Sequence, residues 1–474
     1  MNGLQCSKYL WLVFNASDTI PPTGDATQHI FDEGHIVGDL AKKLYTDGIQ
    51  VPFDNFRENL RETKALLEER RILFEPGFLA DNIYSRLDIL QPANGGEWDI
   101  IEVKMSTEVK DEHIADVAFQ RFCCEKSGLK IRNCSLIHIN NRYIRHGEID
   151  PALLFITEDI TEQVSEYVCG MQDQIDYMFA LISSAACPEV PVGTYCGSPN
   201  PCPVTACAES LPENTILDLY YAGKKKYELY YRGICFIKDI PADYKLTRQQ
   251  EIQQRCENTS QPHIDKAAIK NFINGMQYPL YFFDFETVSS GVPMFDNSRP
   301  YQQIPFQFSV HIMESENTIP VHYGYLADGT GDPRPGLINA LKETLGSAGS
   351  VVAYNQAFEK RVLEQLGQDF PECKEWTETV IARLVDLLVP FRNFDYYNPQ
   401  QKGSASLKHV LPAVTGKSYE GLEIAKGDDA SLAFLKLMFG DISPEERCGI
   451  RENLVKYCGL DTEGMIWIME TLAR

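Results

Sequence analysis

Apolar runs long enough to cross a membrane are missing from this sequence. The longest apolar stretches, such as residues 131–139, are interrupted by Arg, Asn, Ser and His, and they fall far short of the roughly 20 residues that a bilayer requires. Residues 1–14 carry a single base, Lys8, and no small-residue cleavage site follows them, which argues against a signal peptide. We therefore expect a soluble, cytoplasmic protein without a membrane partner.

Basic residues are scarce as well. The chain of 474 residues has 44 Lys plus Arg against 67 Asp plus Glu, which gives a formal net charge of −23. Because Lys and Arg supply most of the non-specific affinity for phosphates, this composition by itself argues against a nucleic-acid enzyme. The hydrophobic content of 44% and the charged content of 23% are ordinary for a globular protein, and the length predicts two or three domains.

Cysteine is too dilute for a secreted disulfide scaffold, with 14 in the whole chain. Three of them, Cys196, Cys202 and Cys207, nevertheless fall within 12 residues of a loop rich in Pro and Gly, and Cys6 lies far away near the N-terminus. Four thiolates could hold either a tetrahedral zinc ion or an iron–sulfur cluster, and the spacing alone does not decide between them. Cys187 is an alternative ligand.

Hydrophobic patterns predict two α/β regions joined by a polar, helical connector. The first region has the order of a small α/β domain, and its expected elements are a helix at 35–45, strands at 72–78, 83–90 and 98–104, a helix at 109–126 and a strand at 135–139. The connector covers residues 216–261 and contains a Gly-Lys-Lys-Lys turn at 223–226 that is suited to a nucleic-acid backbone. A second α/β region opens with a strand at Tyr278.

A first group of chemically active residues is expected on neighbouring strands. Glu102 and Lys104 are two positions apart and therefore point to the same face of a strand, and the preceding β-run delivers Asp88 beside them. Two carboxylates at one point suit Mg²⁺ or Mn²⁺, which lower the pKa of a bound water. Lys104 would orient that water or stabilise charge on a phosphate.

Asp88 followed by Glu102-x-Lys104 resembles the core of PD-(D/E)XK nucleases, in the RecB-like branch shared with CRISPR-associated adaptation nucleases. The resemblance implies that His35, on the first core helix, is a further metal ligand and that Gln120 contacts the site. The aromatic residue that usually follows the glutamine a turn later is not evident in this chain. Iron–sulfur members of the branch take one cysteine from before the core and three from just after it, which implies a [4Fe-4S] cluster held by Cys6, Cys196, Cys202 and Cys207.

A second group of acids lies in the C-terminal region. Asp284 and Glu286 alternate with aromatic residues along a strand, so both carboxylates point to one face, where an apolar core would tolerate them only with a cation. Tyr457 and Asp461, four residues apart, share one helical face. Between these pairs, residues 351–359 read as a strand that runs into a helix and ends at Glu359.

This order resembles the three motifs of RNase H-like DEDD exonucleases, in their tyrosine-bearing form. The resemblance implies that Asp284, Glu286 and Asp461 bind two Mg²⁺ or Mn²⁺ ions, that Tyr457 orients the water, and that the enzyme trims 3′ ends. The middle motif normally supplies an aspartate, whereas Glu359 stands there in this chain, with Asp386 as another acid within reach. The extra methylene of Glu359 would shift the position of the second metal.

The chain as a whole resembles a bacterial family in which an iron–sulfur RecB-like nuclease precedes an RNase H-like domain. We expect an α/β protein with a PD-(D/E)XK-like nuclease at 1–210, a helical connector at 211–265 and an RNase H-like domain at 266–474. The predicted function is metal-dependent hydrolysis of nucleic acid, DNA more than RNA, with a helicase or another repair or defence protein as partner. The alternatives are a binding protein with inactive sites and an RNA-processing exonuclease. The bases expected to steer nucleic acid are Lys224, Lys225, Lys226, Arg142 and Arg145.

Overall fold

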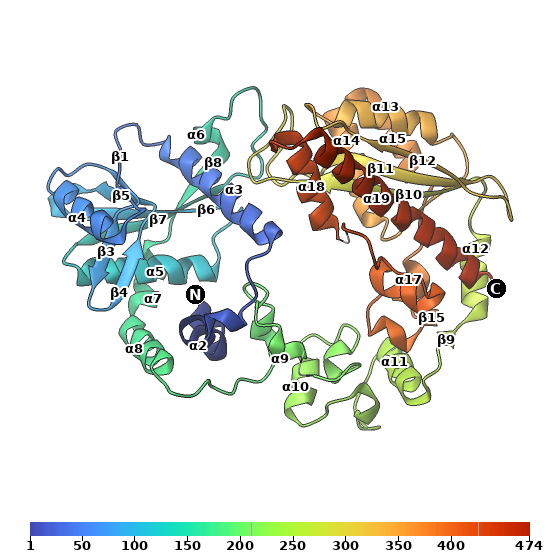
Figure 1. The fold of residues 1–474 in the computed structure, drawn as a ribbon, viewed down its shortest axis with the longest axis horizontal. Coiled ribbons are helices and arrows are strands. Elements are labelled where there is room, and N and C mark those ends of the chain that lie inside the picture. Colours follow the sequence, from blue (N-terminus) through green and yellow to red (C-terminus); the bar gives the residue numbers. More distant parts are fainter. Residues whose placement is uncertain (210, 425) are drawn as a thin grey trace. The chain divides into compact units, whose positions relative to one another are not determined.

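The computed structural model describes residues 1–209, 211–424 and 426–474, and it is a mixed α/β structure. The chain divides into two compact units (Figure 1). The N-terminal unit comprises Met1–Ala208 and Ser290–Gln302, and the C-terminal unit comprises Glu209–Ser289 and Gln303–Arg474. The first division falls within two residues of the predicted boundary at 210. The expected connector at 211–265 belongs to the C-terminal unit. The short segment Ser290–Gln302, although it lies far along the chain, belongs to the N-terminal unit.

A six-stranded sheet forms the centre of the N-terminal unit. Its strand order is β1-β2-β5-β6-β7-β8, with β5 and β6 antiparallel and β6 and β7 parallel. These strands span Ile49–Gln50, Leu73–Phe74, Ile89–Pro92, Trp98–Lys104, Ile131–Ile139 and Phe155–Asp159, and a separate hairpin pairs β3 (Gly77–Ala80) with β4 (Ile83–Arg86). The helices are α1 (Asn2–Gln5), α2 (Ser7–Asn15), α3 (Asp25–Lys42), α4 (Phe56–Leu67), α5 (Asp111–Lys126), α6 (Pro151–Leu154), α7 (Thr161–Val168), α8 (Met171–Ile182) and α9 (Ala206–Glu209).

Alternation along the strands places α3 and α5 on opposite faces of this sheet (Figure 1). Ile100 packs in the cluster that contains the apolar residues of α5, whereas its neighbour Ile101 packs in the cluster that contains Val37 and Ala41 of α3. The strand at 98–104 and the helix at 109–126 are therefore confirmed, within two residues.

Two of the predicted strands are each divided by a bend. The run at 72–78 separates into β2 and β3 around Glu75, whose φ is +57°, and the run at 83–90 separates into β4 and β5 around Leu87 and Asp88. The bend frees Asp88 from the ladder, so its carboxylate accepts the backbone N–H of Val103 at 2.7 Å. The helix predicted at 35–45 begins ten residues earlier and ends at Lys42.

The C-terminal unit is built on a five-stranded sheet with the order β12-β11-β10-β13-β14. Strand β10 is central, antiparallel to β11 and parallel to β13. The strands are β10 (Leu280–Val288), β11 (Ile304–Met313), β12 (Val321–Leu326), β13 (Ser350–Ala353) and β14 (Leu384–Asp386), and a small pair joins β9 (His263–Ile264) to β15 (Tyr396–Tyr397). The helices are α10 (Lys225–Tyr231), α11 (Arg248–Thr259), α12 (Lys266–Asn274), α13 (Arg334–Thr344), α14 (Ala357–Asp369), α15 (Lys374–Ile381), α16 (Val389–Arg392), α17 (Leu407–Thr415), α18 (Gly427–Phe439) and α19 (Pro444–Leu472).

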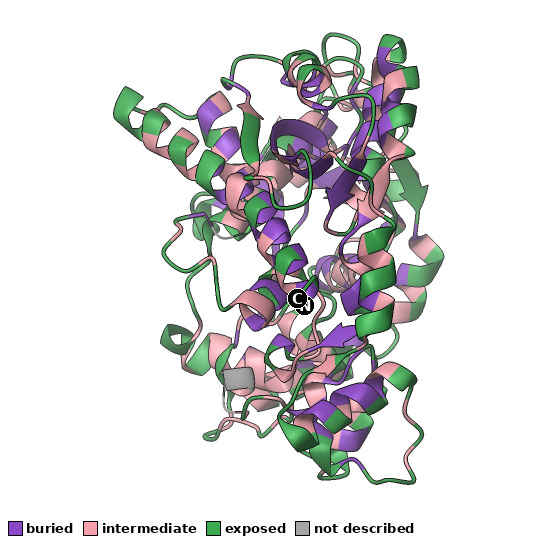
Figure 2. Cartoon of the chain, turned by 90° about the vertical axis from the view of Figure 1, so that its right-hand side faces the viewer, coloured by how far each residue is buried: buried purple, intermediate pink, exposed green. Residues whose placement is uncertain are grey.

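Strand β10 is buried on both faces, which explains its run of aromatic residues. Phe283 and Phe285 pack with α13 and α14, whereas Phe282 packs on the opposite face with α17 and α19. Asp284 and Glu286 share the even-numbered face with Phe282 and so point towards α19. Many helices differ from β10, because they carry buried residues along one side and exposed residues along the other (Figure 2). None of the described helices combines the length and apolar composition of a membrane span.

Residues 290–302 fold back onto the N-terminal unit through polar contacts. Arg145 donates to the carbonyl oxygens of Pro293 and Met294 at 3.0 and 2.8 Å, and the N–H of Gly147 donates to Asp296 at 2.8 Å. Arg145, which we expected to steer nucleic acid, therefore has a structural role in holding this segment. Arg142 is exposed.

Candidate active sites

The first site lies where β6 meets α5, in the N-terminal unit. The Lys104 ammonium lies 2.7 Å from a carboxylate oxygen of Glu102 and 2.6 Å from one of Asp116. Gln120 donates to the other oxygen of Glu102 at 2.8 Å. The structure thus brings together Glu102, Lys104 and Gln120 as expected, and it adds Asp116, which lies four residues before Gln120 on the same helical face. That i, i+4 pair was the available sequence signal for Asp116.

Burial and neighbouring charges shift the pKa values of Asp88, Glu102 and Lys104 at this first site. Burial and the neighbouring charge of Glu102 raise the pKa of Asp88, and burial also raises the pKa of Glu102 against the opposing effect of Lys104. Burial alone would lower the pKa of Lys104, but the carboxylates of Glu102 and Asp116 outweigh it and raise that pKa. Lys104 is therefore a cation, suited to neutralising charge rather than to accepting a proton.

The expected histidine ligand lies apart from these acids. His35 is exposed on α3, and among the described residues no group of three ligand atoms within 4.8 Å includes it. Its role as a ligand remains a prediction from the resemblance. Gln120, in contrast to His35, lies beside Glu102, and its side-chain oxygen is buried without a hydrogen-bond partner. A buried, unpaired oxygen next to a carboxylate fits a cation or a bound donor group.

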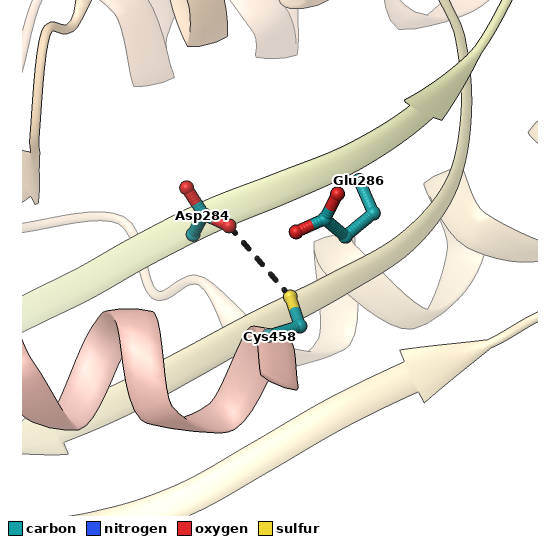
Figure 3. Close-up of side chains that lie close together, drawn as sticks. All are labelled: Asp284, Glu286 and Cys458. Atoms are coloured by element: carbon teal, nitrogen blue, oxygen red, sulfur yellow. Dashed lines mark hydrogen bonds between the residues drawn. The ribbon is translucent and has the colours of Figure 1, made fainter. Parts of the chain in front are cut away.

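The second site is a cavity of about 420 Å³ in the C-terminal unit. Its walls carry the side chains of Asp284 and Glu286 from β10, Glu359 from α14, and Tyr457 and Asp461 from α19. All five predicted residues of the C-terminal site therefore converge, although they span 178 positions of sequence. Oxygens of Asp284 and Glu286 also lie within 4.8 Å of the Cys458 sulfur, and the thiol donates to Asp284 at 3.7 Å (Figure 3).

Burial raises the pKa of all four acids of this cavity. Burial, then the charge of Asp461, raises the pKa of both Asp284 and Glu286 well above the ordinary range. Burial raises the pKa of Glu359 to about 8 and that of Asp461 to about 6. One oxygen of Glu359 is buried without a hydrogen-bond partner. Glu286, Glu359 and Asp461 are buried and Asp284 is partly buried. Carboxylates in this setting either keep protons or bind cations, so the donor set fits a divalent metal.

Three further residues at this second site were not among the predicted ligands. The Tyr419 hydroxyl donates a short hydrogen bond to Asp461. The Lys408 ammonium lies 5.7 Å from the ring centre of Tyr457 and lowers the pKa of Asp461 against the effect of burial. Cys458 follows Tyr457 directly. Tyr419 and Lys408 come from the segment around α17, which has no spacing relation to the three motifs, so only the fold reveals them.

Asp386, the alternative acid to Glu359, has a structural role. One of its oxygens accepts the N–H groups of Asn355 and Leu388 at 2.9 and 3.0 Å, and the other lies 3.4 Å from Arg392. These contacts hold the turn after β14. Asp386 does not line the 420 Å³ cavity, and Glu359 does.

The predicted cysteine ligands gather in the N-terminal unit. Burial raises the pKa of Cys202, and the nearby thiols of Cys196, Cys6 and Cys207 raise it further. Cys187 lies in the same group, because Cys207 and Cys6 also raise its pKa. Gln5 ties the N-terminal helix to this loop by donating to the carbonyl oxygens of Tyr195 and Asn200 at 2.9 and 2.7 Å. The structure therefore brings Cys6 close to the loop that carries Cys196 and Cys202, about 190 residues away in sequence.

The bases expected to steer nucleic acid differ in availability. Lys224 and Lys225 are exposed at the start of α10. Lys226 is partly buried and donates to the carbonyl oxygen of Leu217 at 3.0 Å. The exposed pair is therefore the part of the basic turn that is available to a ligand.

Comparisons with known proteins place the second site in a recognised but functionally undefined segment. A model described as "Domain of unknown function (DUF2779)" matches residues 281–406, which include Asp284, Glu286 and Glu359 and stop before Asp461. The uncharacterized protein MG366 of Mycoplasma genitalium is 29% identical over 219 residues, which are 42% of this chain and 33% of that protein. Its homolog in Mycoplasma pneumoniae is 29% identical over 206 residues, 40% of this chain and 31% of its own length. The chain spans about a third of the length of these curated relatives.

Proposed function

We propose that this protein is a metal-dependent nuclease with two hydrolytic sites, one in each unit. The observation that carries the proposal is the cavity in which the buried carboxylates of Glu286, Glu359 and Asp461 converge with the partly buried Asp284 and with Tyr457, and in which one Glu359 oxygen has no partner. Ionising all four acids in such a cluster is electrostatically costly unless a divalent cation neutralises them. The resemblance to the DEDD exonuclease motifs then suggests phosphodiester hydrolysis at a 3′ end, on an RNase H-like fold.

In the C-terminal site, Asp284, Glu286, Glu359 and Asp461 would hold Mg²⁺ or Mn²⁺. When bound, such metals lower the pKa of water and stabilise the charge of an in-line displacement. Burial and the nearby acids raise the pKa of Tyr457, so its hydroxyl keeps its proton and can donate to the attacking water or to a phosphate oxygen. Tyr419 fixes the Asp461 carboxylate through its hydrogen bond.

In the N-terminal site, Asp88 and Glu102 would hold the metal, as in a PD-(D/E)XK core, with His35 as the further ligand that the resemblance suggests. Lys104 is a cation held by two carboxylates, so it would stabilise negative charge on the phosphate. Gln120 orients Glu102 through its amide. Asp116 anchors Lys104 from the helix side.

A [4Fe-4S] cluster held by Cys6, Cys196, Cys202 and Cys207 completes the proposal for the N-terminal unit. The choice of an iron–sulfur cluster over a zinc ion comes from the resemblance to the iron–sulfur branch of RecB-like nucleases. The gathering of these four thiols in the N-terminal unit supports a shared cofactor. An anaerobic preparation should then absorb near 400 nm.

The test is a cleavage assay with Mn²⁺ on end-labelled single- and double-stranded DNA and RNA, with protein purified without oxygen. We expect release of short products from the 3′ end, and DNA to be cleaved better than RNA. Preference for RNA would support the RNA-processing alternative. Asp284→Ala should remove the 3′ trimming and leave the cleavage that depends on Lys104. Loss of both activities in that variant, with the fold intact, would contradict two separate sites.

One specific observation favours a binding protein with inactive sites as the second candidate. Glu359 replaces the aspartate of the exonuclease motif, and its longer side chain changes the room for a second metal. Tight binding of nucleic acid, with no cleavage of any of the four substrates in Mn²⁺, would decide for this alternative.

A further inference from the structure

A second cavity in the C-terminal unit borders the acidic one. Its volume is about 590 Å³, and Tyr354 and Asn355 line both cavities. The rest of its wall has a different chemistry from the acidic cavity, with Tyr221, Arg392 and Ser404 in place of carboxylates. The four acids therefore have, across two shared wall residues, a neighbouring space lined by an aromatic ring, a cation and a hydroxyl.

Tyr221 is displayed at this cavity by an unusual backbone. Tyr221 is 87% exposed, and its backbone φ of +45° lies in the left-handed region that non-glycine residues avoid. The neighbouring residue is clamped, because Gln253 accepts the N–H of Tyr220 at 2.8 Å and Gln250 donates to its carbonyl oxygen at 2.9 Å. Both glutamines are buried. The strained, solvent-facing tyrosine is thus held in place rather than left loose.

The ring of Tyr220 also contacts the ring of Tyr221 and links it to the core. It packs edge-to-face on Phe394, with ring centres 4.7 Å apart, and edge-to-face on Tyr221 at 4.6 Å. The outer face of Tyr221 remains open to solvent. A planar ligand can therefore stack on it without displacing any part of the core.

Positive charge accompanies the exposed ring. Arg392 is half exposed, and its ion pair with Asp386 is long, at 3.4 Å. Lys224 and Lys225 follow Tyr221 by three and four residues and are exposed. An exposed aromatic ring beside cations, in a chain with a net charge of −23, is the local chemistry of single-strand binding, where bases stack and cations contact phosphates.

We propose that this second cavity binds the nucleotides next to the terminal one of a single-stranded nucleic acid. A base stacks on Tyr221, Arg392 contacts a phosphate, and the terminal nucleotide enters the acidic cavity past Tyr354 and Asn355. The inference rests on the proposed function and narrows its substrate to single strands of several nucleotides. Tyr221 and the lysines lie outside the matched segment 281–406, so this contact comes from the connector.

The experiment measures binding without cleavage. A fluorescent 12-nucleotide DNA or RNA, single-stranded or paired to its complement, is titrated in EDTA and followed by anisotropy. Stacking on an aromatic ring contributes about 5- to 150-fold in affinity per base, so Tyr221→Ala should weaken single-strand binding by at least about fivefold, whereas Tyr221→Phe should not. Tyr231→Ala, another exposed tyrosine of the connector, is the matched control and should bind normally.

A salt titration tests the phosphate contact. Replacing Arg392 by Gln should reduce the slope of log affinity against log salt by about 0.7, the value for one phosphate of a single strand. Whichever of DNA and RNA binds more tightly identifies the natural strand. If Tyr221→Ala binds both strands as the unaltered protein does, or if the duplex depends on Tyr221 equally, the proposal is wrong.

The two proposals fail in different ways. Cleavage that is normal in Tyr221→Ala at substrate concentrations below the KM would overturn the binding inference and leave the nuclease intact. Absence of cleavage in the unaltered protein, together with binding that depends on Tyr221, would overturn the nuclease and leave the single-strand site.

Discussion

Replacing Glu359 by Gln should make the metal-free protein more stable at alkaline pH and less able to bind metal. The Glu359 carboxyl is 2% exposed, has an oxygen without a partner, and has a pKa of about 8 against an ordinary value of 4.5. Each unit of pKa difference corresponds to about 1.4 kcal/mol. The difference therefore sets an upper limit of about 5 kcal/mol on the cost of ionising this group in the folded state.

The sign of the pH dependence follows from proton binding. Between pH 4.5 and about 8 the native carboxyl keeps a proton that the unfolded chain releases, so the native state binds more protons. Stability then falls as pH rises through this window, and it is greatest below pH 4.5 as far as this group is concerned. Glutamine cannot ionise, so the variant should lose this part of the decline. A divalent metal should reverse the effect in the unaltered protein, because the ionised carboxylate is the ligand.

Hydrogen exchange of β10 measures this effect within the C-terminal unit. Exchange is recorded in EDTA and in Mn²⁺ at pH 5 and pH 8.5 and corrected for the intrinsic rate at each pH. The control is Glu364→Gln, an exposed acid on the same helix, which should follow the unaltered protein. An unchanged pH dependence in Glu359→Gln, or equal protection of both proteins by Mn²⁺, would refute the reasoning.

Three other variants test separate parts of the two sites. Tyr419→Phe removes the hydrogen bond to Asp461. Since a hydrogen bond to a charged group is worth about 1.5–3 kcal/mol, 3′ trimming should fall about tenfold or more. The control Tyr177→Phe should leave trimming unchanged. Lys104→Ala should abolish the N-terminal activity, measured in an Asp284→Ala background, and it should destabilise the N-terminal unit because buried Glu102 loses its cation. The control Lys130→Ala should do neither. Retained cleavage in Lys104→Ala would exclude Lys104 from the chemistry. Cys196→Ser should remove the absorption near 400 nm, and Cys235→Ser, an exposed cysteine elsewhere, should preserve it; equal spectra would exclude Cys196 as a ligand.

Local spacing predicted which side chains share a face within two of the motifs of the C-terminal cavity, and the resemblance to DEDD exonucleases joined the three motifs into one site. The two-residue step from Asp284 to Glu286 and the four-residue step from Tyr457 to Asp461 need only a strand and a helix. Tyr419 and Lys408 escaped prediction because they reach the cavity through the path of the chain around α17. No periodicity in the sequence encodes that path.

The N-terminal unit shows where strand prediction from apolar runs fails. Residues 83–90 read as one strand, since nothing in their apolar pattern marks a break. In the structure the chain bends at Leu87 and Asp88, and this bend is what frees the Asp88 carboxylate to accept the Val103 N–H. The interruption that prediction missed is thus the feature that positions a candidate ligand.

The return of residues 290–302 to the N-terminal unit had no signal in the sequence for a related reason. The contacts that hold this segment are donated to backbone carbonyl oxygens, as from Arg145 to Pro293 and Met294. Carbonyl oxygens are present at every residue, so they leave no mark in composition or spacing. The side chains of Arg145 and Asp296 are specific, but the charge of Arg145 suggested a ligand instead.

The two sites should differ in the amount of metal they require, and the reason is their charge. At full ionisation, Asp88, Glu102 and Asp116 with Lys104 carry a net charge of −2, which one divalent cation neutralises. Asp284, Glu286, Glu359 and Asp461 with Lys408 carry −3, so one divalent cation leaves a negative charge. In the metal-free cavity the pKa of about 8 keeps a proton on Glu359 at pH 7, and metal binding must displace it. Binding of Mn²⁺ followed by calorimetry should therefore release protons at pH 7 from the C-terminal site, and Glu359→Gln should reduce this release. Equal proton release in both proteins would mean that Glu359 is already ionised and that metal binding displaces no proton from it.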